Sequence, residues 1–162
     1  MTEVAGFDCV YLIVSPKNPL KEGISSATGQ ERYAAAVQAV ARHPELQVRV
    51  DDIELQMPEP HYTIRTLDAL TEREPENSYT LVIGADNLAC IRNWRDYKRI
   101  LSEYGVAVFP RTGFDLEAIK EDLIKENPQF KITLLNAEMV DISSTTIREA
   151  IASGQDAAAW LM

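Results

Sequence analysis

Apolar residues along the chain gather in short runs that are separated by polar turns and by longer segments of mixed character. The runs are rich in β-branched and aromatic residues, which is typical of strands. They cover residues 9–14, 46–50, 79–84, 106–109 and 130–135. Several are apolar nearly throughout, as in parallel strands that are covered by helices on both faces. The runs therefore predict buried parallel strands.

Between these runs, apolar residues recur at spacings of three and four, which predicts amphipathic helices. The segments are residues 30–43, 62–70 and 115–127. Alternating strands and helices indicate an α/β fold, a doubly wound parallel sheet with right-handed crossovers. Ligands in such folds bind beyond the carboxyl ends of the strands. The chain shows no repeat, low-complexity tract or linker, so we expect residues 1–162 to form a single domain.

Composition narrows the function classes. The 162 residues are 46% hydrophobic and carry a net charge of −9. A nucleic-acid surface would need clustered Lys and Arg, so we expect no nucleic-acid partner, although a few local cations suffice for a small anionic ligand. Cys9 and Cys90 have no metal-binding spacing, which favours a reduced, cytoplasmic protein. Neither a membrane span nor a signal-peptide pattern is present, so we expect a soluble protein without a membrane partner.

Two loops that follow predicted strands carry candidate ligand-binding residues. Residues 15–23 read SPKNPLKEG, and Lys17 and Lys21 are the first cations after that strand. A phosphate contact there competes with a solvated proline-rich loop. Gly84 would let a ligand approach the backbone, and Asp86 would bind ribose hydroxyls. The alternative is an ordinary turn in which the aspartate caps a helix.

Aromatic and hydroxyl residues mark two further places. Tyr62 and Thr63 open a predicted helix, and Thr63 is most simply its N-cap. Trp94 lies in a segment whose spacing gives an apolar face, which favours a core position. That face comprises Ile91, Tyr97 and Leu101. The alternative is that Trp94 presents its ring to a flat heterocycle.

A run of hydroxyl residues near the end of the chain predicts an anion site. The run is Ser143, Ser144, Thr145 and Thr146. It precedes a predicted helix that carries Arg148 in its first turn. Backbone N–H groups, hydroxyls and a guanidinium at a helix start together favour a bound anion. The alternative is a capping box between Thr146 and Glu149, but a cap needs only one hydroxyl.

The block at residues 142–148, ISSTTIR, resembles the I-S-S-T-x-I-R signature of the nucleotidyltransferase superfamily. Further segments resemble, in the same order, the bacterial nicotinate-nucleotide adenylyltransferases. They are SPKNPLK, Glu31-Arg32, VDDIEL, HYTIRTL with His61 in place of the usual serine, VIGADNL, the Trp94 region and Phe109-Pro110-Arg111. The resemblance spans nearly the whole chain.

This resemblance implies a Rossmann-like enzyme of NAD biosynthesis. It would transfer the adenylyl group of ATP to nicotinate mononucleotide, giving deamido-NAD and pyrophosphate. Mg²⁺ is expected to arrive with ATP, and no carboxylate cluster predicts a dedicated metal site. The sequence leaves a homo-oligomer open.

Residue roles follow by the same resemblance. Residues that would hold ATP are Gly84 and Asp86 at the sugar, and Ile142, Ser143, Ser144, Thr145 and Arg148 at the phosphates and adenine. Ser144 and Arg148 would act on the reacting phosphates. Residues that would hold nicotinate mononucleotide are Asn18 and Lys21 at its phosphate, Tyr62, Thr63 and Trp94 around its pyridine ring, and Arg111.

The chain departs from the family pattern in one respect. The family begins with a strand, a turn containing G-x-F-x-P-x-H-x-G-H, and a helix, and the turn's histidines contact the ATP phosphates. Nothing similar occurs in this sequence, because His43 and His61 stand outside any glycine-rich turn. We therefore expect a chain truncated at its N-terminus and at its C-terminus, and a sheet without its central first strand, which leaves a gap between that strand's neighbours.

Two alternatives to an active adenylyltransferase stay open. One is a nucleotide-binding module without catalysis, since the phosphate-binding histidines are absent. The other is a sibling enzyme that acts on nicotinamide mononucleotide or phosphopantetheine. Tyr62, Thr63 and Trp94 favour a pyridine ring over a pantetheine arm, but they do not separate the acid from the amide.

Overall fold

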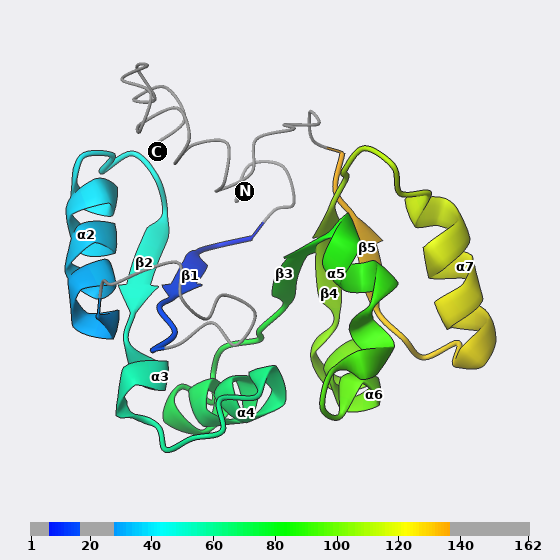
Figure 1. Ribbon diagram of the computed structural model, residues 1–162, viewed down its shortest axis with the longest axis horizontal. Helices are drawn as coiled ribbons and strands as arrows, with labels where there is room; N and C mark the ends of the chain where they lie inside the picture. Colours follow the sequence, from blue (N-terminus) through cyan, green and yellow to red (C-terminus); the bar gives the residue numbers. More distant parts are fainter. Residues whose placement is uncertain (1–6, 17–27, 137–162) are drawn as a thin grey trace.

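The computed structural model describes residues 7–16 and 28–136, and residues 1–6, 17–27 and 137–162 lie outside the described part (Figure 1). The strands are β1 (Val10–Ile13), β2 (Val48–Asp51), β3 (Leu81–Gly84), β4 (Val106–Phe109) and β5 (Ile132–Leu134). The longer helices are α2 (Gly29–Ala41), α4 (Thr63–Arg73) and α7 (Leu116–Glu126). The short helical turns are α3 (Ile53–Gln56), α5 (Ala85–Ala89), η1 (Ile91–Asn93), α6 (Tyr97–Arg99) and the π-helical η2 (Ile100–Tyr104). The predicted strands and longer helices occur with ends shifted by at most three residues.

The strands form two parallel sheets. In the first, β1 pairs with β2 from Val10 opposite Val48 to Ile13 opposite Asp51. In the second, β4 lies between β3 and β5 and pairs with both in parallel. Across the molecule the order is β2, β1, β3, β4, β5, with α2 outside β2 and α7 outside β5 (Figure 1). This confirms the predicted α/β fold.

The break between the sheets falls at the predicted place. Among the described residues, β1 and β3 are neighbours that belong to different sheets and share no ladder. The resemblance places the family's first strand between these two. The prediction of a chain truncated at both ends stays a prediction.

Side-chain caps explain where two of the three longer helices start. Thr28 and Glu31 form a capping box at α2, because the Thr28 hydroxyl accepts from the Glu31 N–H and the Glu31 carboxylate accepts from the Thr28 N–H. At α7, the Asp115 carboxylate accepts from the Ala118 N–H at 3.1 Å. The predicted Thr63 cap is wrong. Tyr62 holds the N-cap position of α4 and makes no side-chain cap, so Thr63 is already the first helical residue.

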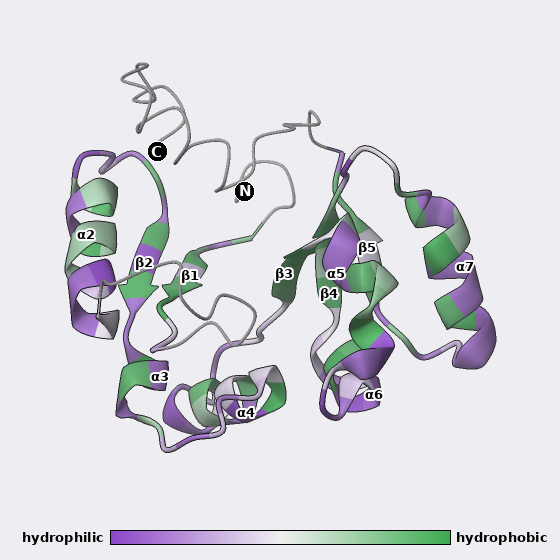
Figure 2. Ribbon diagram, in the orientation of Figure 1, coloured by the Kyte–Doolittle hydropathy of each residue, from purple (hydrophilic) through white to green (hydrophobic). Residues whose placement is uncertain are grey.

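The apolar core lies on the side of the second sheet. Strand β4 is hydrophobic along its length, and α7 turns an apolar stripe toward the sheet (Figure 2). The core cluster comprises Ile64, Leu67, Ile83, Leu88, Ile91, Ile100, Leu101, Val106, Val108, Leu123, Phe130 and Ile132. Trp94 and Tyr97 pack against it while partly buried, as the predicted apolar face requires. Helix α4 contributes Ile64 and Leu67, so it is the element through which the first sheet approaches this core.

Polar contacts join the first sheet to α4. The carboxylate of Asp51, at the end of β2, accepts two hydrogen bonds from the Arg73 guanidinium at 3.1 and 2.6 Å. The carboxylate of Glu74, just after α4, accepts hydrogen bonds from Tyr11, Arg49 and Tyr79 at 3.0, 2.9 and 2.7 Å. Because Tyr11 lies in β1 and Tyr79 precedes β3, Glu74 links the two sheets.

Candidate functional site

The ends of β3 and β4 bring together three of the predicted ligand-binding residues. Gly84 ends β3, Asp86 lies in the first turn of α5, and Arg111 follows β4. The Arg111 guanidinium donates to the Asp86 carboxylate at 3.0 Å, and the two side chains are 41% and 43% exposed. The alternative prediction of Asp86 as a helix cap is wrong, because Gly84 holds the N-cap position and no side chain caps α5. The carboxylate is therefore fixed in direction and open to a ligand.

Gly84 stands where a side chain would collide with this pair. A Cβ at Gly84 would lie 2.7 Å from Asp86 Oδ1 and 3.5 Å from Arg111 Cδ. The first distance is shorter than real Cβ contacts, so any larger residue would displace the carboxylate. Close approach of a ligand to the Gly84 backbone stays a prediction.

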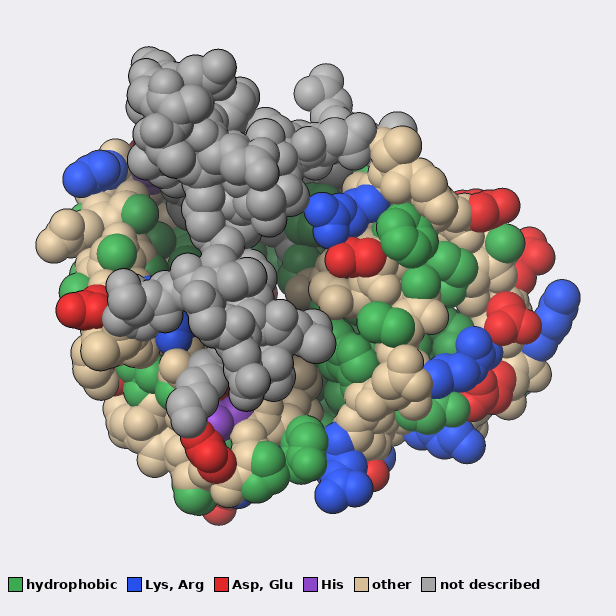
Figure 3. Space-filling model, viewed as in Figure 1, with side chains coloured by type: hydrophobic (Ala, Val, Ile, Leu, Met, Phe, Trp, Pro, Cys, Tyr) green, Lys and Arg blue, Asp and Glu red, His purple; other side chains and the backbone are tan. Residues whose placement is uncertain are grey.

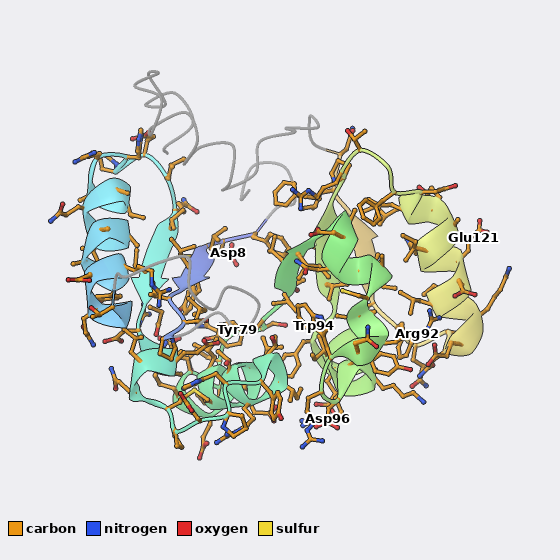
Figure 4. The ribbon with its side chains drawn as sticks, in the orientation of Figure 1. Asp8, Tyr79, Arg92, Trp94, Asp96 and Glu121 are labelled. Atoms are coloured by element: carbon orange, nitrogen blue, oxygen red, sulfur yellow. The ribbon has the colours of Figure 1, made fainter. Side chains whose placement is uncertain are left out.

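Two aromatic residues lie at the start of α4 and after α5. Tyr62 is 39% exposed, and the Arg95 guanidinium stands over its ring at 5.0 Å from the centroid. Trp94 is partly buried against the core, which bears out the core interpretation in part. In Figure 4, Trp94 lies in the half of the molecule that contains β3, β4 and β5, on the side nearer to β1. Thr63 is partly exposed beside Tyr62.

A buried carboxylate connects the end of β1 with α4. Glu54 is 8% exposed, and its two oxygens accept hydrogen bonds from the hydroxyls of Ser15 and Thr66, the second at 2.7 Å. Arg32, in α2, donates to the main-chain carbonyls of Ser15 and Pro16 at 2.5 and 2.9 Å. The chain at residues 15–16 is therefore held from both sides at the point where β1 ends.

The charged groups that join the sheets have shifted pKa values. Burial alone would raise the pKa of Asp51, but the hydrogen bonds from Arg73 and from the Ile53 N–H, with the nearby positive charges, lower it. Hydrogen bonds from Tyr79, Arg49 and Tyr11 lower the pKa of Glu74 to about 2. Burial, with the hydrogen bond to Glu74, raises the pKa of Tyr79 to about 12. These groups keep their neutral-pH charge states, which suits a structural link rather than proton transfer.

The remaining predicted site residues lie outside the described part of the chain. They are Asn18, Lys21, Ile142, Ser143, Ser144, Thr145 and Arg148. Their assignments stay predictions.

Sequence reasoning missed Glu54 and Arg95. The Glu54 contacts join positions 12 and 39 residues apart, and no local spacing signals such pairs. Arg95 follows Trp94 in a basic, aromatic segment, and that adjacency is the signal that could have identified it. Arg32 entered only as part of the resemblance, and the structure gives it a specific contact.

The described surface and helices bear on charge, metal binding and membrane insertion. On the face shown in Figure 3, Lys and Arg side chains lie among those of Asp and Glu over the part of the molecule that contains β3, β4 and β5. Within residues 7–16 and 28–136, no group of three or more His, Cys, Asp or Glu side chains is arranged to hold a metal ion. No helix in the same ranges is long and apolar enough to cross a membrane.

A family model described as cytidylyltransferase-like matches residues 2–150. The chain belongs to the cytidylyltransferase-like family.

Curated relatives give a finer comparison. A probable nicotinate-nucleotide adenylyltransferase of Flavobacterium johnsoniae is 34% identical over 156 residues, covering 96% of this chain and 77% of the relative. A protein of the same name from Bacteroides fragilis is 34% identical over 156 residues, with 96% and 73% covered. One from Parvibaculum lavamentivorans is 40% identical over 113 residues, with 70% and 54% covered. The predicted resemblance is confirmed.

Solved structures support the fold. A Plasmodium falciparum nicotinic acid mononucleotide adenylyltransferase complexed with NaAD has a TM-score of 0.70 to this chain at 17% identity. The likeness covers 93% of this chain and 73% of that chain. At this identity it shows the fold alone, and it agrees with the predicted nucleotidyltransferase type of sheet.

Proposed function

We propose that this chain transfers the adenylyl group of MgATP to nicotinate mononucleotide, forming deamido-NAD and releasing pyrophosphate. The observation that carries the proposal is the similarity to a probable nicotinate-nucleotide adenylyltransferase over 96% of the chain. The grouping of Gly84, Asp86 and Arg111 at the carboxyl ends of neighbouring parallel strands supports it, because ligands of such sheets bind there.

The reaction is a single displacement at phosphorus. An oxygen of the mononucleotide phosphate attacks the α-phosphorus of ATP, and the bond from that phosphorus to the bridging oxygen breaks. Pyrophosphate leaves with the electron pair. The protein has no covalent step to perform, so alignment of the two phosphates and neutralisation of developing charge supply the catalysis.

The ATP site in this proposal has a sugar part and a phosphate part. Asp86 accepts hydrogen bonds from ribose hydroxyls, and its ion pair with Arg111 fixes the carboxylate in that direction. Ser143, Ser144 and Arg148 bind the phosphates, with hydroxyl and guanidinium donors of the kind that favour anions. Ile142 and Thr145 complete the adenine side.

The mononucleotide site uses aromatic and basic residues. Tyr62, Thr63 and Trp94 surround the pyridine ring, while Asn18 and Lys21 bind the phosphate. The Arg95 guanidinium stands 5.0 Å from the Tyr62 ring centroid, so in this proposal it is also close to the pyridine ring. A cation there favours the carboxylate of nicotinate over the neutral amide of nicotinamide.

The test is pyrophosphate release from ATP with three acceptors: nicotinate mononucleotide, nicotinamide mononucleotide and phosphopantetheine. We expect the highest kcat/KM with nicotinate mononucleotide, and a smaller preference for acid over amide in Arg95→Gln. Nucleotide binding without release from any acceptor would identify a binding module. A higher kcat/KM with either other acceptor would identify a sibling transferase.

Asp86→Asn tests the sugar contact. Loss of a charge-assisted hydrogen bond should raise the KM for ATP about 10- to 100-fold, since such bonds contribute about 1.5–3 kcal/mol. Asp122→Asn is the matched control. Asp122 is an exposed carboxylate that also pairs with an arginine, Arg92, at 2.9 Å, but it does not lie at the strand ends. An unchanged KM for ATP in Asp86→Asn would remove Asp86 from the site.

We also propose a reducing compartment, the cytoplasm, for this chain. Cys9 and Cys90 are both free thiols on the surface, a state that a reducing environment preserves. Both thiols should therefore react with a maleimide in a cell extract. After an oxidant is added, they should stay reactive only until the reducing buffer is exhausted.

A further inference from the structure

The start of α4 carries two residues assigned above to the pyridine ring of nicotinate mononucleotide, and Ser15 follows the carboxyl end of β1, where ligands of parallel sheets bind. Ser15 precedes Asn18 by three positions and Lys21 by six in the sequence. Tyr62 and Thr63 open α4. A mononucleotide has its phosphate at one end and its pyridine ring at the other, so these two elements must stand at a fixed separation for both ends to bind.

Glu54 is placed to set that separation. Its carboxylate accepts from Ser15 with one oxygen and from Thr66 with the other, and Thr66 is one turn of helix beyond Tyr62. The Thr66 hydroxyl also lies 3.4 Å from the Tyr62 carbonyl oxygen. The carboxylate therefore joins the residues that directly follow β1 to the first turn of α4.

The burial of this group argues for a dedicated role. Glu54 is 8% exposed and Thr66 is 5% exposed. A buried carboxylate is costly unless its oxygens are hydrogen-bonded, and an apolar residue could fill the same space without that cost. Among the described residues, no Lys or Arg forms an ion pair with Glu54, and both of its oxygens are used by hydroxyl donors from other elements.

Arg32 completes the arrangement from the opposite side. Its guanidinium donates to the carbonyls of Ser15 and Pro16, so α2 holds the backbone while Glu54 holds the Ser15 side chain. The direction in which the chain leaves β1 is fixed by both contacts.

From this geometry we propose that Glu54 is a positioning residue for the nicotinate mononucleotide site, which it serves by fixing the end of β1 relative to the first turn of α4. The inference rests on the proposed function. Glu54 touches no substrate in this account, and it acts through Ser15 and Thr66. Misplacement by about 1 Å can cost on the order of 100-fold in rate, so loss of the link should be visible in kinetics.

A pair of matched variants tests the proposal. Thr66→Val removes the donor to Glu54 and keeps the side-chain shape. Thr71→Val makes the same change on the same helix, where the hydroxyl bonds to the Leu67 carbonyl and lies near the Tyr104 hydroxyl instead. Thr66→Val should lower kcat/KM for nicotinate mononucleotide about 10- to 100-fold, with the KM for ATP changed less than about twofold. Thr71→Val should leave both values unchanged.

Glu54→Gln and Ser15→Ala extend the test. Each should reproduce the selective effect on nicotinate mononucleotide, and the Glu54→Gln, Thr66→Val double variant should be no worse than Glu54→Gln, because both remove one interaction. If Glu54→Gln fails to fold, as a thermal melt would show, Ser15→Ala and Thr66→Val still decide the matter. Equal loss toward both substrates, or the same loss in Thr71→Val, would overturn the positioning role.

The outcome is separable from that of the proposed function. If the parent forms no deamido-NAD, the proposed function fails, and amide hydrogen exchange then decides the structural claim. Thr66→Val should speed exchange at residues 13–15 and 62–66, and Thr71→Val should not. Unchanged exchange in Thr66→Val would overturn the link itself.

Discussion

The half of the molecule built on β3, β4 and β5 and the half built on β1 and β2 are held together by different interactions. In the β3–β5 half, strands and helices bury apolar side chains, among them Leu101 and Val108 at 0% exposure. In the β1–β2 half, β1, β2 and α2 contain no buried hydrophobic residue, and Val14, directly after β1, is buried. The buried polar residues, Asp51, Glu54 and Thr66, belong to this half or face it from α4.

The difference shows which kind of interaction determines the structure of each half. A packed apolar core needs only hydrophobic residues of suitable volume at the right spacing, whereas a link between polar groups needs particular partners at particular places. Within the described residues the two sheets share no ladder, so Glu74 and the Tyr11–Tyr79 ring contact at 5.6 Å carry much of their connection, and Asp51 joins β2 to α4. Of the described residues assigned to the mononucleotide, Tyr62 and Thr63 open α4, whereas Trp94 packs against the core of the β3–β5 half.

The largest expected effect comes from matched leucines in the two halves. Leu101 is fully buried, and Leu12, in β1, is 39% exposed. Leu101→Ala should lower the free energy of unfolding by about 2–5 kcal/mol, because it leaves a cavity in the core. Leu12→Ala should cost less than about 1 kcal/mol. Chemical denaturation of both variants measures this, and equal losses would contradict the contrast.

A smaller effect is expected at the polar link between β2 and α4. Asp51→Asn keeps an acceptor for the Ile53 N–H but loses the charged pairing with Arg73, and should cost about 1–3 kcal/mol of unfolding free energy. The neighbouring Asp52→Asn is the control, since Asp52 makes no side-chain cap to α3. If both variants unfold at the same denaturant concentration as the parent, the link contributes nothing to stability.

The smallest effect is a pH dependence at Glu74. Its pKa falls to about 2 in the folded protein, from about 4.3 in an unfolded chain. A carboxylate with a lowered pKa stabilises the folded state above the unfolded value, and that contribution is lost as the pH falls from about 4.3 to about 2. The melting temperatures of parent and Glu74→Gln should therefore differ at pH 7 and converge in acid.

Glu72→Gln provides the comparison on the same stretch of α4, because Glu72 is exposed there. It should melt close to the parent at every pH. A Glu74→Gln difference that persists unchanged below pH 3 would mean that the carboxylate's charge does not matter.

The sequence predicted the core half better than the polar half. Strand 106–109 is apolar throughout and was found at those residues, and the spacing of Ile91, Tyr97 and Leu101 identified a real packing face. Periodicity reports burial, so it finds such elements. It carries no information about which hydroxyl meets a buried carboxylate, and so the contacts of Glu54 were missed.

At the candidate site, how well the sequence predicts the structure differs from residue to residue. The sequence proposes Gly84 and Asp86 because strand ends in a parallel sheet gather at one edge, and the structure adds the Arg111 pairing that orients the Asp86 carboxylate. Thr63 was misplaced as a cap, because a hydroxyl before an apolar run signals a helix start only to within a residue. Arg95 was missed although it adjoins Trp94, because the sequence does not show that its guanidinium stands over the Tyr62 ring.

The most direct measurement follows heavy oxygen from the phosphate of nicotinate mononucleotide into the products of its reaction with ATP. If that phosphate attacks the α-phosphorus of ATP, mass spectrometry will find deamido-NAD that keeps every labelled oxygen and pyrophosphate that has none. Attack at the β- or γ-phosphorus would instead release AMP or ADP and leave every labelled oxygen on a mononucleotide that has gained phosphoryl groups but no adenosine. Formation of AMP and pyrophosphate without any dinucleotide would show that water is the acceptor, and the account of this chain as an adenylyltransferase would be wrong.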